Sequence, residues 1–211
     1  MPSVLTRIGT PLSVQGYLLQ ASSLVVELLR SAHAQHAAAS PVAPASAPEA
    51  KPAVDSVVTM IETILRYGQL ATATALFEAA DVLRAALHAM SPRDHGGGGG
   101  IVLQLVDAIA RAAQQRLHLL VSGDPALRRV WHVIDLILAI LRGAIVHGLA
   151  LDPRGFDAID DHDWRAWLRL HGASPSSLDC GFMRGIYDLA FAYEGGDPER
   201  PSLSAAVALR G

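Results

Sequence analysis

Residue types that could do chemistry are concentrated in the last third of the chain, and the first group there is acidic. Its members are Asp157, Asp160, Asp161, His162 and Asp163. Several carboxylate oxygens close together can bind a hard cation such as Ca²⁺. The cluster lacks the central glycine and distal glutamate of a calcium loop, and it stands where acidic residues stabilise a helix N-terminus. We therefore expect Asp161 to cap a helix that continues to His171, and we assign no metal site.

A second group contains the candidate nucleophiles. Cys180, the one cysteine in 211 residues, falls in the first turn of a helix expected from Ser176 to Tyr193. A helix dipole can lower the pKa of a thiol in that position. The pattern identifies no partnered base, and no Gly-x-Ser-x-Gly elbow surrounds Ser176 or Ser177, which we expect to cap the helix. We expect Cys180 to be a packing residue and assign no catalytic residue.

Aromatic and imidazole side chains recur at helical spacing just after the acidic cluster. Trp164 and Trp167 share one face of the expected helix, His171 stands one turn further on, and Tyr187 and Tyr193 lie on the next helix. These five residues offer apolar walls with a few polar tips, which is typical of a small-molecule site. We expect any cavity to lie between the two helices. The alternative is that all five side chains simply pack the helices.

Two further patterns imitate ligand sites. His33 and His36 have a spacing that can hold a metal on one helix face, but no carboxylate or thiol stands near them, which favours solvated histidines. The run Gly96–Gly100 lacks the one, three and six glycine spacing of a dinucleotide turn, and a helical pattern precedes it where that turn needs a strand. Consecutive glycines disfavour a helix, so residues 92–100 are predicted to form a flexible loop.

The composition favours a helical protein with a large apolar interior. Hydrophobic residues make up 51% of the chain and charged residues only 18%, against about 25% charged in an average soluble domain. This balance excludes disorder throughout. A single cysteine excludes a disulfide within the chain, and a net charge of −3 gives no reason to expect nucleic acid as a partner.

Helical spacing and strong breaks predict an all-α fold, an irregular bundle of about six to eight helices with two flexible loops. The expected helices are Ser13–His33, two within Val54–Met90 divided at Gly68, Ile101–Val121, one from Pro125 to about Leu149, one ending at His171, Ser176–Tyr193 and a short terminal helix capped by Ser202. We divide the chain into an N-terminal helix (1–36), a Pro/Ala-rich linker (37–53) and a helical domain (54–211). The helix from Pro125 is apolar nearly all round, which predicts a place in the middle of the fold.

Targeting signals are weak. The first 19 residues lack the compact order of a signal peptide, so we expect a cytoplasmic protein. The most membrane-like stretch, Val130–Leu151, contains Asp135, Arg142 and His147, and each ionisable group near a bilayer centre costs roughly 2.5 kcal/mol or more. A buried helix is the better interpretation. Peripheral membrane contact stays open because the chain is hydrophobic overall.

Several segments of the last quarter together resemble one protein family. They are Phe156–Asp161 (FDAIDD), Trp164–Leu168 (WRAWL), His171–Ser174 (HGAS), Arg184–Tyr193 (RGIYDLAFAY), Gly196–Asp197 and Ala206–Gly211 (AVALRG). Together these sequences resemble a stretch in large bacterial FAD-dependent oxidoreductases of the flavin amine oxidase and phytoene desaturase-like group. The helix from Arg128 to Gly143 looks like the same region. The resemblance is clear over the last quarter of the chain and loose over most of its second half.

The resemblance implies a substrate-side or cap region, because the FAD-binding strand and glycine turn of such enzymes are absent from this sequence. It implies FAD as the cofactor of the whole enzyme, a hydrophobic amine or polyene as substrate, and a flavin-binding domain or subunit as partner. No residue here can be assigned as an FAD ligand, so we expect the chain to be inactive and not to bind FAD alone. The alternative is a non-catalytic helical interaction protein or subunit, since the sequence contains no acid–base or metal constellation.

Overall fold

The computed structural model describes residues 13–38, 59, 61–62, 73–89, 98–121 and 125–210. Within these ranges the elements are helices joined by turns, and the only β-pairing consists of two isolated bridges. The predicted all-α, multi-helix fold is therefore confirmed for this part of the chain. No helix in the described ranges combines the length and the apolar content needed to cross a bilayer.

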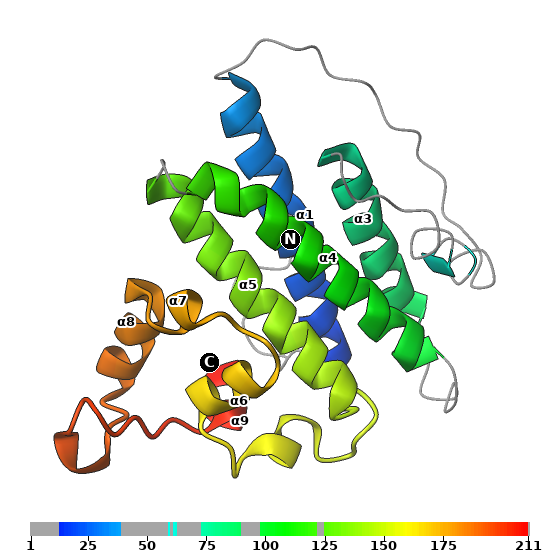
Figure 1. Cartoon of the computed structure of the whole chain (residues 1–211). Coiled ribbons are helices and arrows are strands. Elements are labelled where there is room, and N and C mark those ends of the chain that lie inside the picture. The colour runs from blue at the N-terminus through cyan, green and yellow to red at the C-terminus, as the bar shows by residue number, and fades with distance from the viewer. Residues whose placement is uncertain are drawn as a thin grey trace, which may run out of the picture.

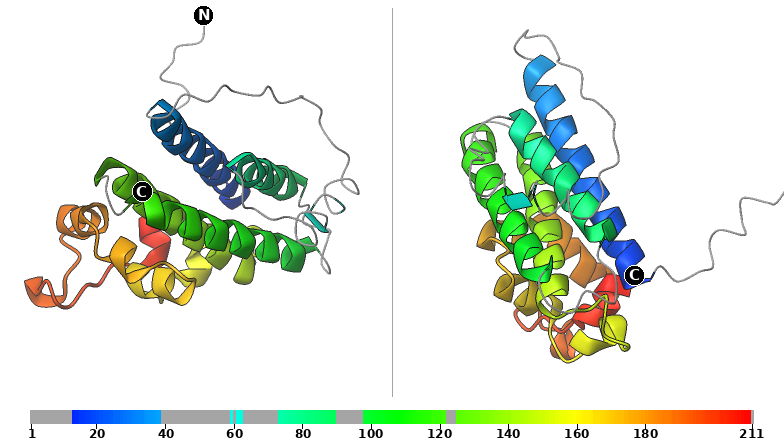
Figure 2. Two further views of the ribbon diagram at one scale, coloured as in Figure 1. Left: turned by 45° about the horizontal axis from the view of Figure 1, so that its top comes forward. Right: turned by 90° about the vertical axis from the view of Figure 1, so that its right-hand side faces the viewer.

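Four long helices form a bundle: α1 (Val14–Ala38), α3 (Ala73–Ala89), α4 (Gly98–Val121) and α5 (Pro125–Val146). Helix α1 packs on α3 and α5, and α4 packs on the same two neighbours. Figure 2 shows α1 and α3 as one layer and α4 and α5 as the next, with the C-terminal elements beyond them. The bundle follows from apolar residues that recur every three or four positions, as at Leu18, Val25 and Leu29 of α1.

Helix α5 is buried on nearly every side, as its composition predicts. Each residue from Ile134 to Leu141 is buried, including the carboxylate-bearing Asp135. One side of α5 packs on α1 and α4, and another side carries the short C-terminal helices (Figure 1). An amphipathic helix would leave a polar face to water, whereas α5 has neighbours on several faces.

The remaining elements form a C-terminal unit beside α5. They are η2 (Gly155–Ile159), α6 (Trp164–Leu170), α7 (Pro175–Leu178), α8 (Gly181–Ala190), η3 (Glu194–Gly196) and α9 (Ala205–Arg210). Helices α6 and α7 pack on α5, and α9 packs on η2 and α6. Helix α8 lies at the edge of the molecule (Figure 1).

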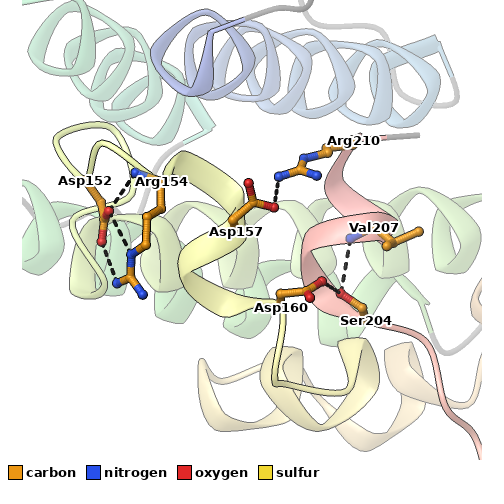
Figure 3. Close-up of polar contacts among 7 residues, drawn as sticks. All are labelled: Asp152, Arg154, Asp157, Asp160, Ser204, Val207 and Arg210. Atoms are coloured by element: carbon orange, nitrogen blue, oxygen red, sulfur yellow. Dashed lines mark hydrogen bonds and ion pairs between the residues drawn. The ribbon is translucent and has the colours of Figure 1, made fainter.

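Polar contacts join the two ends of this unit (Figure 3). The Arg210 guanidinium pairs with Asp157, and the Ser204 hydroxyl donates to Asp160 Oδ1 at 2.6 Å. The same hydroxyl oxygen accepts from the backbone N–H of Val207 at 3.3 Å, so it caps α9. The acidic residues expected to serve one helix N-terminus therefore also hold α9 on η2.

Several predicted helix boundaries are wrong. Asp163, two residues after the predicted Asp161, caps α6, and its Oδ1 accepts from the N–H of Ala166 at 2.9 Å. The helix predicted from Ser176 to Tyr193 is two helices, since the chain turns at Asp179 and Cys180. A side chain bonded to a backbone N–H decides where a helix starts, and several acceptors compete for that position here.

Three more boundaries differ from the sequence predictions. Ser174 caps α7 in place of Ser176 and Ser177, and Ser204 caps α9 in place of Ser202. Helix α4 begins at Gly98, so the last three residues of the predicted loop 92–100 are helical. Extending a helix that the following apolar residues have already nucleated costs much less than starting one, which allows glycines in its first turn.

Helix α1 runs to Ala38, two residues beyond the predicted N-terminal segment, whereas α5 ends at Val146 and not near Leu149. Other predictions lie outside the described residues. These are the rest of the linker 39–53, the break at Gly68, the loop residues 92–97 and the side chains of His33 and His36.

Asp163 is also the polar centre of the C-terminal unit. Its Oδ2 accepts from the Tyr187 hydroxyl of α8 at 3.0 Å and from the N–H of Leu203 at 3.2 Å. The Tyr187 oxygen in turn accepts from the N–H of Arg165 at 2.9 Å. One carboxylate thus fixes α6, α8 and the segment before α9 relative to one another.

We predict that Tyr187→Phe lowers the free energy of unfolding by about 1–3 kcal/mol, because it leaves the Arg165 N–H without an acceptor in a buried place. Tyr193→Phe is the matched control, since the Tyr193 hydroxyl donates to Asp188 at the surface and its loss should change stability little. Urea unfolding followed by circular dichroism measures both. Equal effects of the two substitutions would contradict the proposed role of Asp163.

Candidate functional site

The most chemically distinctive group in the described residues lies where the end of α5 meets α6. It consists of His147, His162, Trp164, Trp167 and His171, here called the histidine–tryptophan cluster. His147 follows α5, His162 precedes α6, and the other three belong to α6 or to its C-cap. Three of the five residues predicted to line a small-molecule site are therefore neighbours in space.

The two indoles and the His171 imidazole form a packed row. The rings of Trp164 and Trp167 are stacked, with centroids 5.7 Å apart, and Trp167 meets His171 edge-on at 4.7 Å. Spacings of three and four residues put these rings on one side of α6, as the sequence predicts. All three side chains are buried.

A glycine of α5 makes this row possible. A Cβ atom built on Gly143 would lie 2.7 Å from His171 Cδ2 and closer still to the Trp167 ring. Real Cβ atoms essentially never approach other atoms so closely, so no larger residue fits without movement. Gly143 therefore lets the Trp167 ring rest against the backbone of α5.

His147 and His171 share a hydrogen bond across the junction. Their Nε2 atoms are 3.1 Å apart, so one ring donates an N–H and the other accepts with an unprotonated nitrogen. His162 is close by, with its ring centroid 5.8 Å from that of His147. Two imidazolium ions cannot form this bond, so the geometry requires at least one neutral ring.

The electrostatic surroundings favour neutral rings. Burial lowers the pKa of His171 to about 4, with smaller contributions from His147, Arg142 and His162. Burial is also the largest cause of a lowered pKa at His147, followed by the neighbouring His162. Near neutral pH this pair carries no charge, and beside their mutual bond one ring has an unprotonated Nδ1 and the other an Nδ1–H.

The indole N–H groups of Trp164 and Trp167 are buried and have no hydrogen-bond partner among the described residues. Buried polar groups normally have a partner, and leaving one without costs free energy. The cluster therefore combines an uncharged histidine pair with two unused donors in an apolar setting. Such a setting suits a lipophilic molecule with one weakly polar group.

The two tyrosines predicted to share the site form a separate contact. The rings of Tyr187 and Tyr193 are 6.0 Å apart, and their hydroxyls serve Asp163 and Asp188 respectively. Burial raises the pKa of the Tyr187 phenol, so it stays protonated as a donor. Both residues have structural partners, and a role in lining a substrate site stays a prediction for them.

The sequence did not indicate that Gly143, His147 and His162 belong to this site. The first and the last are 19 positions apart in the chain, yet all three lie against the rings of the cluster. A glycine inside a strongly apolar helix was the available signal, since it costs about 1 kcal/mol and calls for a packing reason. Nothing in local spacing shows that His147 faces His171, because only the turn between α5 and α6 brings them together.

Other candidate groups have structural roles. Asp135 is buried in α5, and its Oδ2 accepts from both the N–H and the hydroxyl of Ser174, at 2.8 and 2.7 Å. Cys180 is a free, half-buried thiol at the N-cap position of α8, and its side chain makes no capping hydrogen bond within the described residues. In the described part of the chain no three His, Cys, Asp or Glu side chains are arranged to hold a metal ion.

Comparison with known proteins found no matching family model, no similar curated protein and no similar solved structure.

We predict that Gly143→Ala lowers the free energy of unfolding by about 1–3 kcal/mol, because the new methyl group collides with Trp167 and His171. Gly185→Ala in α8 is the matched control, since no described residue lies within 4 Å of a Cβ built there. Ala favours a helix interior over Gly by about 1 kcal/mol, so the control should gain stability. Thermal and urea unfolding measure the difference, and a gain at both positions would contradict the close contact.

We predict that stability falls in weak acid because of His171. In the unfolded chain its pKa returns to the ordinary 6.5, whereas in the fold it is about 4. Between these values the unfolded state binds more protons, so the free energy of unfolding decreases as pH falls from about 6.5 to about 4. Unfolding in urea across this range should show a shallower pH dependence for His171→Gln. His162→Gln, which alters a more exposed ring, should keep most of the slope.

Proposed function

We propose that this chain is the helical, substrate-side portion of an FAD-dependent oxidoreductase of the flavin amine oxidase and phytoene desaturase-like group, inactive without a flavin-binding partner. The observation that supports the proposal is the amino-acid sequence of residues 156–211, which resembles that family. In the structure this stretch is one packed unit, from η2 to α9, that carries most of the histidine–tryptophan cluster. The segment that carries the resemblance is thus also the segment with the most distinctive chemistry.

In this proposal FAD binds to the partner. The glycine-turn type of FAD site consists of a strand, a glycine turn and a helix N-terminus, and the described ranges contain no strand that could supply one. We therefore assign the flavin and the oxidation to the partner, and to this chain only contacts with the substrate.

The cluster is suited to a lipophilic amine or polyene. Its indole rings are apolar, and the uncharged histidine pair places no ion against a polyene, while an unprotonated ring nitrogen of the pair can accept from a protonated amine. Val146 and Leu170, the residues before His147 and His171, are 54% and 67% exposed. An apolar surface next to a buried polar pair is the composition expected where a hydrophobic molecule enters.

The second candidate is a non-catalytic helical interaction protein. It is favoured by α8, which lies at the edge of the molecule (Figure 1). This helix exposes the large apolar side chains of Phe182 and Leu189. In this case the cluster only packs α6 on α5, and the chain acts through its surface.

Purification separates the two proposals. The chain should be expressed alone and together with any glycine-rich FAD-motif protein encoded beside it. We expect flavin absorbance in the two-chain complex and none with the chain alone. A stable complex without flavin would favour the interaction protein. Flavin bound by the chain alone would contradict the substrate-side assignment.

Substrate contact is tested with a defined probe. Dodecylamine should quench the tryptophan fluorescence of the complex, and Leu170→Ser should weaken this binding because it removes an apolar side chain beside His171. Val207→Ser, which alters an exposed aliphatic residue on α9, is the control and should bind as the unsubstituted chain does. Identical binding by both variants would remove the cluster from the substrate site.

A further inference from the structure

Helix α8 has one buried side and one exposed side of unusual composition. Met183 and Tyr187 are buried against the rest of the C-terminal unit. On the opposite side Phe182 is 58% exposed and Leu189 is 84% exposed. These two residues are seven positions apart, so they lie almost in line along the helix. Isolated exposed apolar residues are common, but two in line on one helix face indicate a docking surface.

The residue that ends α8 is also unusual. Phe191 has φ of 50° in the left-handed region and is 89% exposed. Gly or Asn usually takes that position, because a bulky side chain there is strained. Glycine would adopt this backbone conformation without strain, so an exposed phenylalanine here does not stabilise the fold. Its presence indicates a role in contacts with another molecule.

Charged residues border the other flank of the same face. Arg184 and Asp188 are one turn apart and exposed. They are not paired with each other, and among the described residues Arg184 has no ion-pair partner at all. Between the charged and the apolar flank lies Gly185, with open space where a side chain would be. A second helix backbone can therefore approach closely at this point.

We propose that this face of α8 binds the same face of a second copy of the chain, with the two helices antiparallel about a twofold axis between Gly185 and Ile186. The arrangement is self-complementary. Phe182 of each copy meets Leu189 of the other, and Arg184 of each copy comes within reach of Asp188 of the other. In an isologous contact every such pair occurs twice, so both flanks contribute two equivalent contacts.

The length of α8 limits the strength of this contact. Ten residues of helix span about 15 Å, so the pair buries less than the roughly 1,600 Å² of a standard interface. The dimer is therefore weak and depends on protein concentration. Its charged flank also makes it sensitive to salt.

Sedimentation equilibrium of the full chain tests the proposal. The average mass should rise with concentration from the 22.3 kDa monomer towards twice that value. Arg184→Asp should weaken association about tenfold or more, because like charges then face each other twice. The double variant Arg184→Asp with Asp188→Arg restores opposite charges and should recover most of the affinity. Leu189→Ser should also weaken association, whereas Val207→Ser on α9 should not.

Cross-linking tests the antiparallel register. A cysteine at Gly185 lies next to the axis, so Gly185→Cys with Cys180→Ser should form a disulfide-linked dimer on mild oxidation. Two native Cys180 residues would be about 16 Å apart along the helices, too far for a disulfide. A chain that stays monomeric at all concentrations, or a double charge variant no better than the single one, would overturn the proposal. Circular dichroism of each variant confirms that it is folded.

Discussion

The contact between the Trp167 ring and the backbone at Gly143 is the constraint on which the arrangement of the second half depends. It seats α6 directly on α5, and α6 in turn supports α9 and borders α7. A ring against a glycine brings two helices closer together than side-chain interdigitation allows, and close packing leaves little room for water. This contact and the buried Asp135–Ser174 bonds nearby hold the C-terminal unit to α5, and the edge-on contact of Phe156 with Tyr17 joins the same unit to α1.

The close contact between Gly143 and Trp167 also determines the chemistry of the cluster. His171 lies beside Trp167 and is buried by the same contact, which lowers its pKa and favours the neutral ring. A neutral His171 can form a hydrogen bond with His147 through a single N–H. In a pair exposed to water, the pKa of each ring would stay near its ordinary value. Packing and protonation are thus coupled. The proposed substrate role needs this coupling, because a lipophilic molecule is better held by a wall without net charge.

The helices themselves were largely predictable, because a helix that packs on another has apolar residues every three or four positions whatever the arrangement of the bundle. The central place of α5 was predictable too, because only a helix with neighbours on several sides can be apolar all round. Helix ends were less predictable. Asp161 and Asp163, or Ser202 and Ser204, are equally good caps by residue type, and the choice depends on which one also reaches a distant partner such as Tyr187 or Asp160.

By itself the sequence determined an all-α chain with a buried α5 and an aromatic stripe on α6. Only the tertiary structure decided that His147 meets His171, that Gly143 receives Trp167, and that the two tyrosines serve Asp163 and Asp188. The physical reason is that a sequence pattern reports on neighbouring residues, whereas these contacts join residues far apart in the chain. Periodicity records which face of a helix is buried, but the pairing of two faces depends on turns and on complementary shapes far apart in the chain.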